Sequence, residues 1–165
     1  MSYQDALNFC AELKEQEPKG GQNKAGMLYT LPTEAQWEYA CRGGSTTCFV
    51  FGDDESRLSD YASYDKFREG HEKEAHHSRN VGQKKANPWG LCDMHGNVLE
   101  WCRDRYQERL EGGRDPYVGI GSRSEVILRG GSWMSTPRWL RSASRYKFEP
   151  TFRGSNVGFR LLIAD

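Results

Sequence analysis

The 165-residue sequence lacks features that would place it in several large classes of proteins. No apolar run approaches the roughly 20 residues of a membrane-spanning helix, and residues 1–5 lack the charged-then-apolar pattern of a secretory signal. Lys and Arg total 23, as do Asp and Glu, so no cationic excess favours a nucleic-acid backbone. We expect no membrane span, no nucleic-acid partner, and either a cytoplasmic location or a domain cut from a longer exported chain.

The cysteines form neither a CxxC pair nor the paired spacing of a metal site. There are five, Cys10, Cys41, Cys48, Cys92 and Cys102. An odd number without a regular framework favours reduced, mostly buried thiols. A Cys92–Cys102 or a Cys41–Cys48 disulfide stays open as an alternative.

Common catalytic signatures are also missing. The sequence has no GxSxG nucleophile motif, no P-loop, no dinucleotide-binding glycine pattern and no HExxH zinc motif. The adjacent His76 and His77 cannot both direct their rings at one metal without strain, and the charged residues around them are typical of a solvated loop. Motifs of this kind therefore point to no enzyme class.

The sequence is rich in aromatic residues and in glycine. Aromatic residues make up 12% of the chain and 18 residues are glycine, while all hydrophobic residues together reach only 36%. That composition favours short strands and long ordered loops over a helical bundle. A chain of this length buries roughly 70% of its unfolded surface, enough for one core. Since no repeat or linker is visible, residues 1–165 are expected to form a single α+β domain.

Two helices are indicated by local sequence. Apolar residues recur at steps of three and four between Ser2 and Glu15, which predicts an amphipathic helix that ends at the turn 18–23. In the segment 31–37, Thr33 can cap a second helix and Gln36 can complete a capping box. That helix is expected to end at the two glycines 43–44, which suit a left-handed cap.

Short apolar pieces between turns predict strands. They lie near residues 61–64, 90–94, 98–101, 126–129, 140–143 and 158–162, and the rest of 45–88 is expected to be ordered loop. Large rings that stand beside glycines are expected to pack in the core. Arginines that stand beside small residues are expected to bond to buried acceptors instead of a ligand. The rings expected to anchor the core are Trp37, Trp89, Trp101 and Trp133, and the arginines expected to satisfy buried acceptors are Arg141 and Arg160.

Six segments in order carry a resemblance to a known family. They are LPTEAQWEYA at 31–40, NPWGL at 87–91, DMHGNVLEW at 93–101, RGGSW at 129–133, RSA at 141–143 and NVGFR at 156–160. Together they resemble the formylglycine-generating enzyme, or sulfatase-modifying factor, family. The resemblance implies a C-type-lectin-like fold with two helices, short antiparallel strands and long ordered loops. Family members usually begin with a further strand-rich segment, so this chain is expected to be a minimal version or a fragment.

The residues do not support the activity that the resemblance implies. The family's founding enzymes convert a sulfatase cysteine to formylglycine with copper and oxygen, at two cysteines that follow the Gly-Gly-Ser-aromatic motif. The corresponding positions here hold Ser135 and Leu140, and no cysteine follows Cys102. Serine and leucine cannot supply the sulfur ligands that select Cu(I). We expect no copper and no catalytic residues of this type.

A calcium site is a second implication of the resemblance. The segment 93–100 combines oxygen donors with a glycine turn, which suits Ca²⁺. Family members hold a structural calcium with these motif positions, here Asp93, Gly96, Val98 and Glu100. The alternative is that Glu100 pairs with a buried arginine and that Asp93 caps a turn.

The segment 134–155 replaces the family's active-site region with aromatic and cationic residues. Such residues dominate binding hot spots, and some relatives of this fold are ligand-binding proteins diversified by retroelements in the same stretch. The predicted ligand-binding residues are Met134, Ser135, Thr136, Arg138, Trp139, Ser144, Tyr146, Lys147, Phe148, Thr151, Phe152 and Ser155. The alternative is a mixed surface with some rings folded inward.

These observations favour a non-catalytic recognition domain that binds a protein or glycan ligand through the 134–155 surface, in a parent protein that could carry a fused effector domain. The second hypothesis is a divergent formylglycine-generating oxidase, or a subunit of one, that modifies a protein cysteine with a partner supplying the metal site. The third is a structural or assembly subunit without a small ligand.

Overall fold

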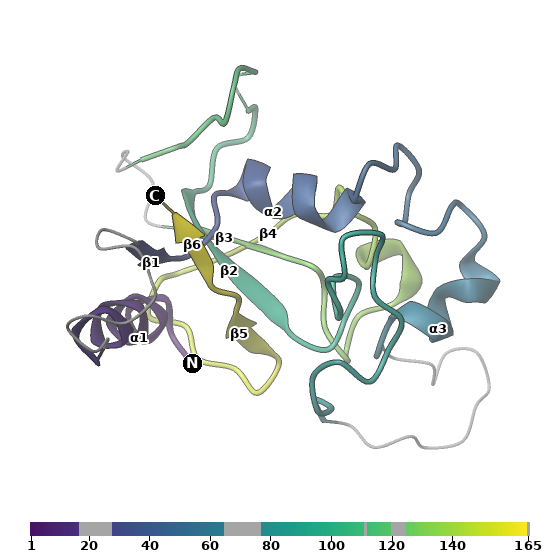
Figure 1. The fold of residues 1–165 in the computed structure, drawn as a ribbon, viewed down its shortest axis with the longest axis horizontal. Coiled ribbons are helices and arrows are strands. Elements are labelled where there is room, and N and C mark those ends of the chain that lie inside the picture. The colour runs from purple at the N-terminus through teal and green to yellow at the C-terminus, as the bar shows by residue number, and fades with distance from the viewer. Residues whose placement is uncertain (17–27, 65–76, 111, 120–124, 165) are drawn as a thin grey trace.

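The computed structural model describes residues 1–16, 28–64, 77–110, 112–119 and 125–164, and Figure 1 shows how their elements are arranged. The helices are α1 (Tyr3–Gln16), α2 (Glu34–Arg42) and the short α3 (Leu58–Tyr61), with 3₁₀ turns η1 (Glu55–Arg57) and η3 (Pro137–Trp139). The strands are β1 (Leu28–Thr30), β2 (Leu99–Arg105), β3 (Val126–Arg129), β4 (Tyr146–Phe148), β5 (Val157–Phe159) and β6 (Leu162–Ala164). The expected mixture of helices, short strands and long loops is confirmed.

A four-stranded sheet with the order β4-β3-β2-β5 lies at the centre of the domain. β3 runs antiparallel to both β2 and β4, whereas β5 runs parallel to β2. The β2–β5 pair therefore departs from the antiparallel arrangement that we expected. β1 and β6 pair antiparallel in a separate two-stranded sheet.

The two longer helices pack on opposite faces of the central sheet. Successive side chains of a strand point to alternate faces, and the core follows this rule. Trp101 and Leu128 pack with Ala6 of α1, whereas Ile127, the neighbour of Leu128, packs with Trp37 of α2. The sheet thus separates two apolar clusters, one under each helix.

Side-chain caps set where both helices begin. The predicted capping box of α2 is present: Thr33 Oγ1 accepts from the Gln36 amide at 3.1 Å, and the Gln36 side-chain oxygen accepts from the Thr33 amide at 2.9 Å. Gly43 then ends α2 in the expected left-handed conformation, with φ of 51°. At α1, Ser2 Oγ accepts from the Asp5 amide and the Asp5 carboxylate accepts from the Ser2 amide, so Ser2 caps the helix within the Met1–Ser2 region expected for its start.

Three predicted strands are absent. Tyr61 ends helix α3, and the residues that follow it to 64 are irregular. Residues 90–94 and 140–143 form turns and irregular backbone. A side chain organises the first of these turns, because Asn87 Oδ1 accepts from the amides of Trp89 and Leu91. Local bonds of this kind replace a strand ladder.

Burial of the tryptophans and arginines was only partly predicted. Trp37 and Trp101 are buried as expected, but Trp133 is half-buried and Trp89 is 47% exposed. The turn held by Asn87 turns the Trp89 ring outward onto the exposed Tyr39 of α2, with ring centroids 4.8 Å apart. Arg141 is likewise exposed, and its Nε donates to the carbonyl of the neighbouring turn residue Arg138.

The five cysteines are all free thiols, so neither alternative disulfide forms. Cys10, Cys41 and Cys102 are buried, as expected for structural thiols, while Cys92 is half-buried and Cys48 is exposed. His77 is exposed as expected, whereas His76 lies outside the described residues.

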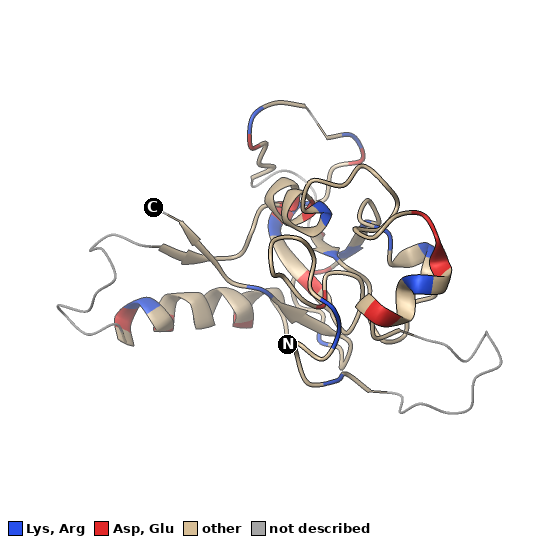
Figure 2. Cartoon of the chain, turned by 45° about the vertical axis from the view of Figure 1, so that its right-hand side comes forward, with Lys and Arg blue, Asp and Glu red and all other residues tan. Residues whose placement is uncertain are grey.

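Charges of both signs are interspersed along the helices and loops, as Figure 2 shows. On α2, for example, Glu38 pairs with Arg42 one turn later at 2.7 Å. In the part of the chain that the structure describes, no helix combines the length and apolar character needed to cross a membrane.

Gly131 is a position where we expect an added methyl group to be costly. Its φ is 73°, and a Cβ there would lie 2.5 Å from the Leu140 side chain and 3.1 Å from the Trp139 carbonyl oxygen. Gly90→Ala is a matched control, since φ is 80° and nothing lies within 4 Å. Both variants should lose about 1–2 kcal/mol to the left-handed backbone, and Gly131→Ala should lose a further 1–3 kcal/mol or so to overpacking. Denaturant unfolding measures both, and equal losses would contradict the packing argument.

Candidate functional site

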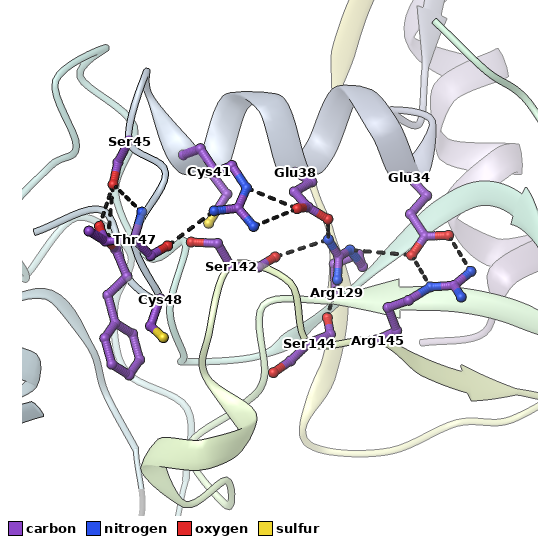
Figure 3. A network of polar contacts seen from close by, with 12 residues as sticks. Glu34, Glu38, Cys41, Ser45, Thr47, Cys48, Arg129, Ser142, Ser144 and Arg145 are labelled. Carbon is purple, nitrogen blue, oxygen red and sulfur yellow. Dashed lines mark hydrogen bonds and ion pairs between the residues drawn. The ribbon is translucent and has the colours of Figure 1, made fainter. Parts of the chain in front are cut away.

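A buried arginine at the end of β3 connects the sheet, α2 and the segment before β4 (Figure 3). Arg129 is fully buried and donates to the Ser142 carbonyl at 2.9 Å, to the Ser144 carbonyl and to the Glu38 carboxylate of α2. Its Nε lies 3.5 Å from Glu34 Oε1. Because an unpaired buried charge is costly, these carboxylates and carbonyls fix the position of the segment 142–144.

A second arginine, Arg145, lies in the segment before β4 and also binds α2. Arg145 donates to both carboxylate oxygens of Glu34, at 2.6 and 2.8 Å, and to the Gln107 carbonyl at 3.0 Å. The hydrogen bonds to Glu34 raise the pKa of Arg145 above its ordinary value. Such a two-point contact fixes geometry as well as charge. The backbone that enters β4 is therefore held against α2.

His95 holds the start of the same segment. The ring is buried, its Nδ1 lies 2.8 Å from the Leu140 carbonyl oxygen, and its Nε2 accepts from the Val50 amide at 3.1 Å. Nδ1 therefore carries the proton and Nε2 does not, which defines a neutral ring. Burial lowers the pKa of His95 to about 4, in agreement with that state.

Above this frame lies a group of exposed and half-buried side chains, which we call the Trp139 patch. Met134 is 56% exposed and Trp139 is 47% exposed. The Trp139 ring centroid lies 5.6 Å from that of Tyr146, whose hydroxyl donates to the Trp139 carbonyl at 2.9 Å. The patch comprises Met134, Ser135, Thr136, Arg138, Trp139 and Tyr146.

The other predicted ligand-binding residues lie apart from this patch. Ser144 is buried, and its hydroxyl donates to the Arg138 carbonyl at 3.3 Å, beneath the patch. Lys147 alternates with Tyr146 along β4, so it points to the opposite face, where it pairs with Glu125 at 2.9 Å.

A third group lies at the end of β4 and beyond it. The rings of Phe148 and Phe152 stack with centroids 4.3 Å apart, and Phe148 packs against the core on the α1 side. Thr151 and Ser155 are exposed in the connection to β5. The twelve predicted residues therefore do not form one continuous surface.

The two positions that correspond to the copper cysteines are part of the packing. Leu140 is fully buried beside Phe49 and Leu58, and Ser135 Oγ accepts from the Ser132 amide at 2.9 Å. Neither side chain carries a thiol. Burial raises the pKa of the Cys41 thiol to about 12, so this thiol is protonated at neutral pH.

Two of the four predicted calcium ligands, Glu100 and Asp93, are already bonded within the protein. Both carboxylate oxygens of Glu100 accept from Arg160, at 2.9 and 3.0 Å, and one also accepts from the Trp37 indole at 2.6 Å. The Asp93 carboxylate accepts from the Gly82 amide at 2.8 Å. Among the described residues, no group of three or more His, Cys, Asp and Glu side chains could hold a metal. Glu100 thus pairs with the half-buried Arg160, through oxygens that the calcium prediction assigned to the ion.

The calcium site stays a prediction that thermal melting can test. Because Arg160 already neutralises Glu100, we expect the melting temperature to be the same in excess calcium and in chelator. Any ligand that binds only the folded state raises it. A rise of several degrees with calcium, absent with magnesium, would show that the ion binds in spite of the ion pair.

The neutral His95 leads us to expect a loss of stability in mild acid. Its pKa is about 4 in the folded protein against an ordinary 6.5, so the unfolded chain binds more protons between these values and stability falls as pH falls through them. The contribution of His95 to this loss is roughly 2 kcal/mol between about pH 7 and pH 5. Denaturant unfolding of the wild type and His95→Asn at both pH values measures it. An equal loss in the variant would rule out His95 as its source.

Comparison with known sequences agrees with the resemblance. The sequence matches the Sulfatase-modifying factor enzyme 1-like domain over residues 1–165. Serine/threonine-protein kinase pkn1 of Chlamydia caviae is 34% identical over 141 residues, which are 79% of this chain and 20% of that protein. The formylglycine-generating enzyme of Streptomyces coelicolor is 32% identical over 142 residues, 79% of this chain and 45% of the relative. The chain thus spans half or less of the length of these relatives.

Solved structures give the same result. PvdO from Pseudomonas aeruginosa superimposes with a TM-score of 0.79 at 30% identity, over 98% of this chain and 59% of PvdO. Treponema denticola variable protein 1 gives a TM-score of 0.71 at 36% identity, over 81% of this chain and 47% of that protein. With the fold and the sequence motifs in agreement, the chain belongs to the sulfatase-modifying factor family of formylglycine-generating-enzyme-like domains.

Proposed function

We propose that this domain is a non-catalytic recognition module that binds a protein or glycan ligand through the Trp139 patch. The observation that carries the proposal is the exposure of Trp139 and Met134, at 47% and 56%, above a backbone that is held from below. Exposed Trp and Arg side chains at well-ordered positions are the residues that most often carry binding energy.

The rigidity of the patch supports this role. The Leu140 carbonyl accepts from His95, the Ser142 and Ser144 carbonyls accept from Arg129, and Tyr146 closes the patch through its bond to the Trp139 carbonyl. A backbone that is already ordered before binding loses little further entropy when the ligand arrives. The patch therefore meets the main requirement for recognition by a pre-formed surface.

The chemistry of the site supports a role without catalysis. At the positions of the copper-binding cysteines, Ser135 provides a hydroxyl that is bonded to the Ser132 amide, and Leu140 provides an apolar side chain inside the core. No thiolate pair can form there, and Cu(I) selects such soft ligands. An oxidase of the family type would need a different metal site or a partner that supplies one.

The relatives support a modular parent protein. A protein named a serine/threonine-protein kinase carries the matching segment over one fifth of its length. A fold neighbour is named a variable protein. Both fit a recognition domain joined to a separate effector domain. The relatives named formylglycine-generating enzymes favour the second candidate, an oxidase or one of its subunits.

Binding by the Trp139 patch is tested with a glycan array and a displayed peptide library, followed by Kd measurement on any binder. Trp139→Ala should weaken that binder by about tenfold or more, close to 1.4 kcal/mol, since a buried contact ring is lost. Trp89→Ala is the matched control, because Trp89 is equally exposed at 47% but lies on the α2 side. It should leave Kd unchanged.

Two outcomes would overturn the proposal. One is that Trp89→Ala weakens the binder as much as Trp139→Ala does. The other is that the folded protein, supplied with copper and oxygen, converts the cysteine of a sulfatase-motif peptide to an aldehyde detected by mass spectrometry. The second outcome would establish the oxidase and require a metal site other than Ser135 and Leu140.

A further inference from the structure

The segment that carries the Trp139 patch has charge of one sign. Residues 130–148 contain no Asp or Glu, although the whole chain has equal numbers of acidic and basic residues. Arg145 and Lys147 are already paired with glutamates of other segments. Arg138 of the patch and Arg141 beside it are exposed, and neither forms an ion pair with a residue that the structure describes. These two positive charges are therefore open to a ligand.

Both arginines are held at η3, the turn that carries the exposed Trp139 ring. The Arg138 guanidinium carbon lies 5.7 Å from the centroid of that ring, close enough for a favourable contact between cation and ring. Arg141 Nε donates to the Arg138 carbonyl at 3.0 Å. This bond uses Nε and leaves the two terminal nitrogens of Arg141 as donors. An exposed ring and two guanidinium groups are thus gathered at one turn.

The backbone acceptors of this segment are already used inside the protein. Every carbonyl from Thr136 to Ser142 accepts a hydrogen bond. In the order of these carbonyls, the donors are the Trp139 amide, the Leu140 amide, Arg141 Nε, the Tyr146 hydroxyl, His95 Nδ1, the Ser144 amide and the Arg129 guanidinium. None of the patch side chains is a carboxylate or an amide. The surface therefore offers mainly donors and apolar area, and a ligand has to supply the acceptors.

The exposed side chains favour a protein ligand over a glycan. The exposed members of the patch are Met134, Arg138 and Trp139, and Met, Arg and Trp are enriched at protein interfaces. The flexible methionine side chain adapts to apolar partners of different shape. The hydroxyl groups of a neutral sugar would find few acceptors here, and a sulfated glycan would leave the Met134 side chain without an apolar partner.

We propose that the Trp139 patch binds an acidic segment of a partner protein, in which Asp or Glu residues lie next to a large apolar residue. The carboxylates bind the guanidinium groups of Arg138 and Arg141, since the planar fork of arginine matches a carboxylate. The apolar residue packs against Met134 and Trp139. Such a ligand presupposes the recognition function proposed above and gives that function its chemical class of partner.

A displayed library of random peptides, selected on the immobilised domain, tests this class of ligand. We expect the selected peptides to be enriched in Asp and Glu beside aromatic or large aliphatic residues. Replacing every Asp by Asn and every Glu by Gln in the best peptide should raise its Kd roughly tenfold or more, because charge-assisted hydrogen bonds to the arginines are lost. Selected peptides without acidic residues, or a sulfated glycan that binds more tightly than any peptide, would overturn the proposal.

Variants of the domain connect the binding to the two arginines. Arg138→Gln with Arg141→Gln should raise the Kd of the acidic peptide about fivefold or more and leave that of its uncharged version unchanged. Arg109→Gln with Arg114→Gln is the matched control, because it removes the same charge at exposed positions between β2 and β3. An equal loss in the control would show that only the net charge of the domain matters, which would contradict a site at η3.

An exchange of charge keeps the test decisive if the glutamine variants also change the fold. Arg138→Glu with Arg141→Glu should lose the acidic peptide and gain the peptide in which Lys replaces Asp and Glu, which the wild type should bind at least tenfold more weakly. A structural defect would not produce this gain. Binding of neither peptide by a variant that melts like the wild type would overturn the proposal.

Trp139→Ala separates this proposal from the recognition function on which it rests. If Trp139→Ala raises the Kd of the best peptide and the Arg138 and Arg141 variants do not, the patch binds a ligand but not through these charges. The acidic ligand is then wrong and the recognition function stands. If none of these variants changes the Kd, the patch is not the binding site and both proposals are wrong.

Discussion

The structure depends on the compensation of one buried charge. Arg129 is fully buried at the end of β3. Its guanidinium binds the Glu38 carboxylate and the backbone carbonyls of Ser142 and Ser144. The Glu34 carboxylate lies beside it, 3.5 Å from Nε. Removing one partner of such a buried pair typically costs 3–5 kcal/mol or so. The same guanidinium lies over the ring of Trp37, 5.3 Å from its centroid, and the Trp37 indole donates to Glu100. One connected set of polar and ring contacts thus joins α2 to β3 and β2.

In this arrangement, the groups that hold the domain together are different from the side chains that it exposes to a ligand. The segment before β4 is held in large part through backbone carbonyls, which every residue has. The side chains that also hold it are Leu140, which enters the core, and Arg145, which binds Glu34. Exposed neighbours such as Met134, Arg138 and Trp139 contribute little to that frame. Binding residues on loops positioned by a rigid scaffold can change without unfolding it. This division supports the recognition function proposed above.

Local sequence predicted the helix boundaries, whose signals lie within a few residues of each other. It failed where contacts between distant residues determine the backbone conformation. The capping box at Thr33 and the left-handed Gly43 were readable because all partners lie within one helix. The segment 140–143 was expected to form a strand, but the bond from His95 to the Leu140 carbonyl holds it in a turn. The twelve binding residues were grouped by position along the chain, although alternation along β4 already separates Lys147 from Tyr146.

The way in which the Trp139 patch is held has a consequence for its response to a ligand. The patch rests on Tyr146 at the start of β4, and hydrogen bonds from His95 and Arg129 hold the backbone beneath it. On the function proposed above, a ligand that binds the patch would stabilise the folded state by mass action. An effector domain in a longer parent protein would then be brought together with the ligand through this surface.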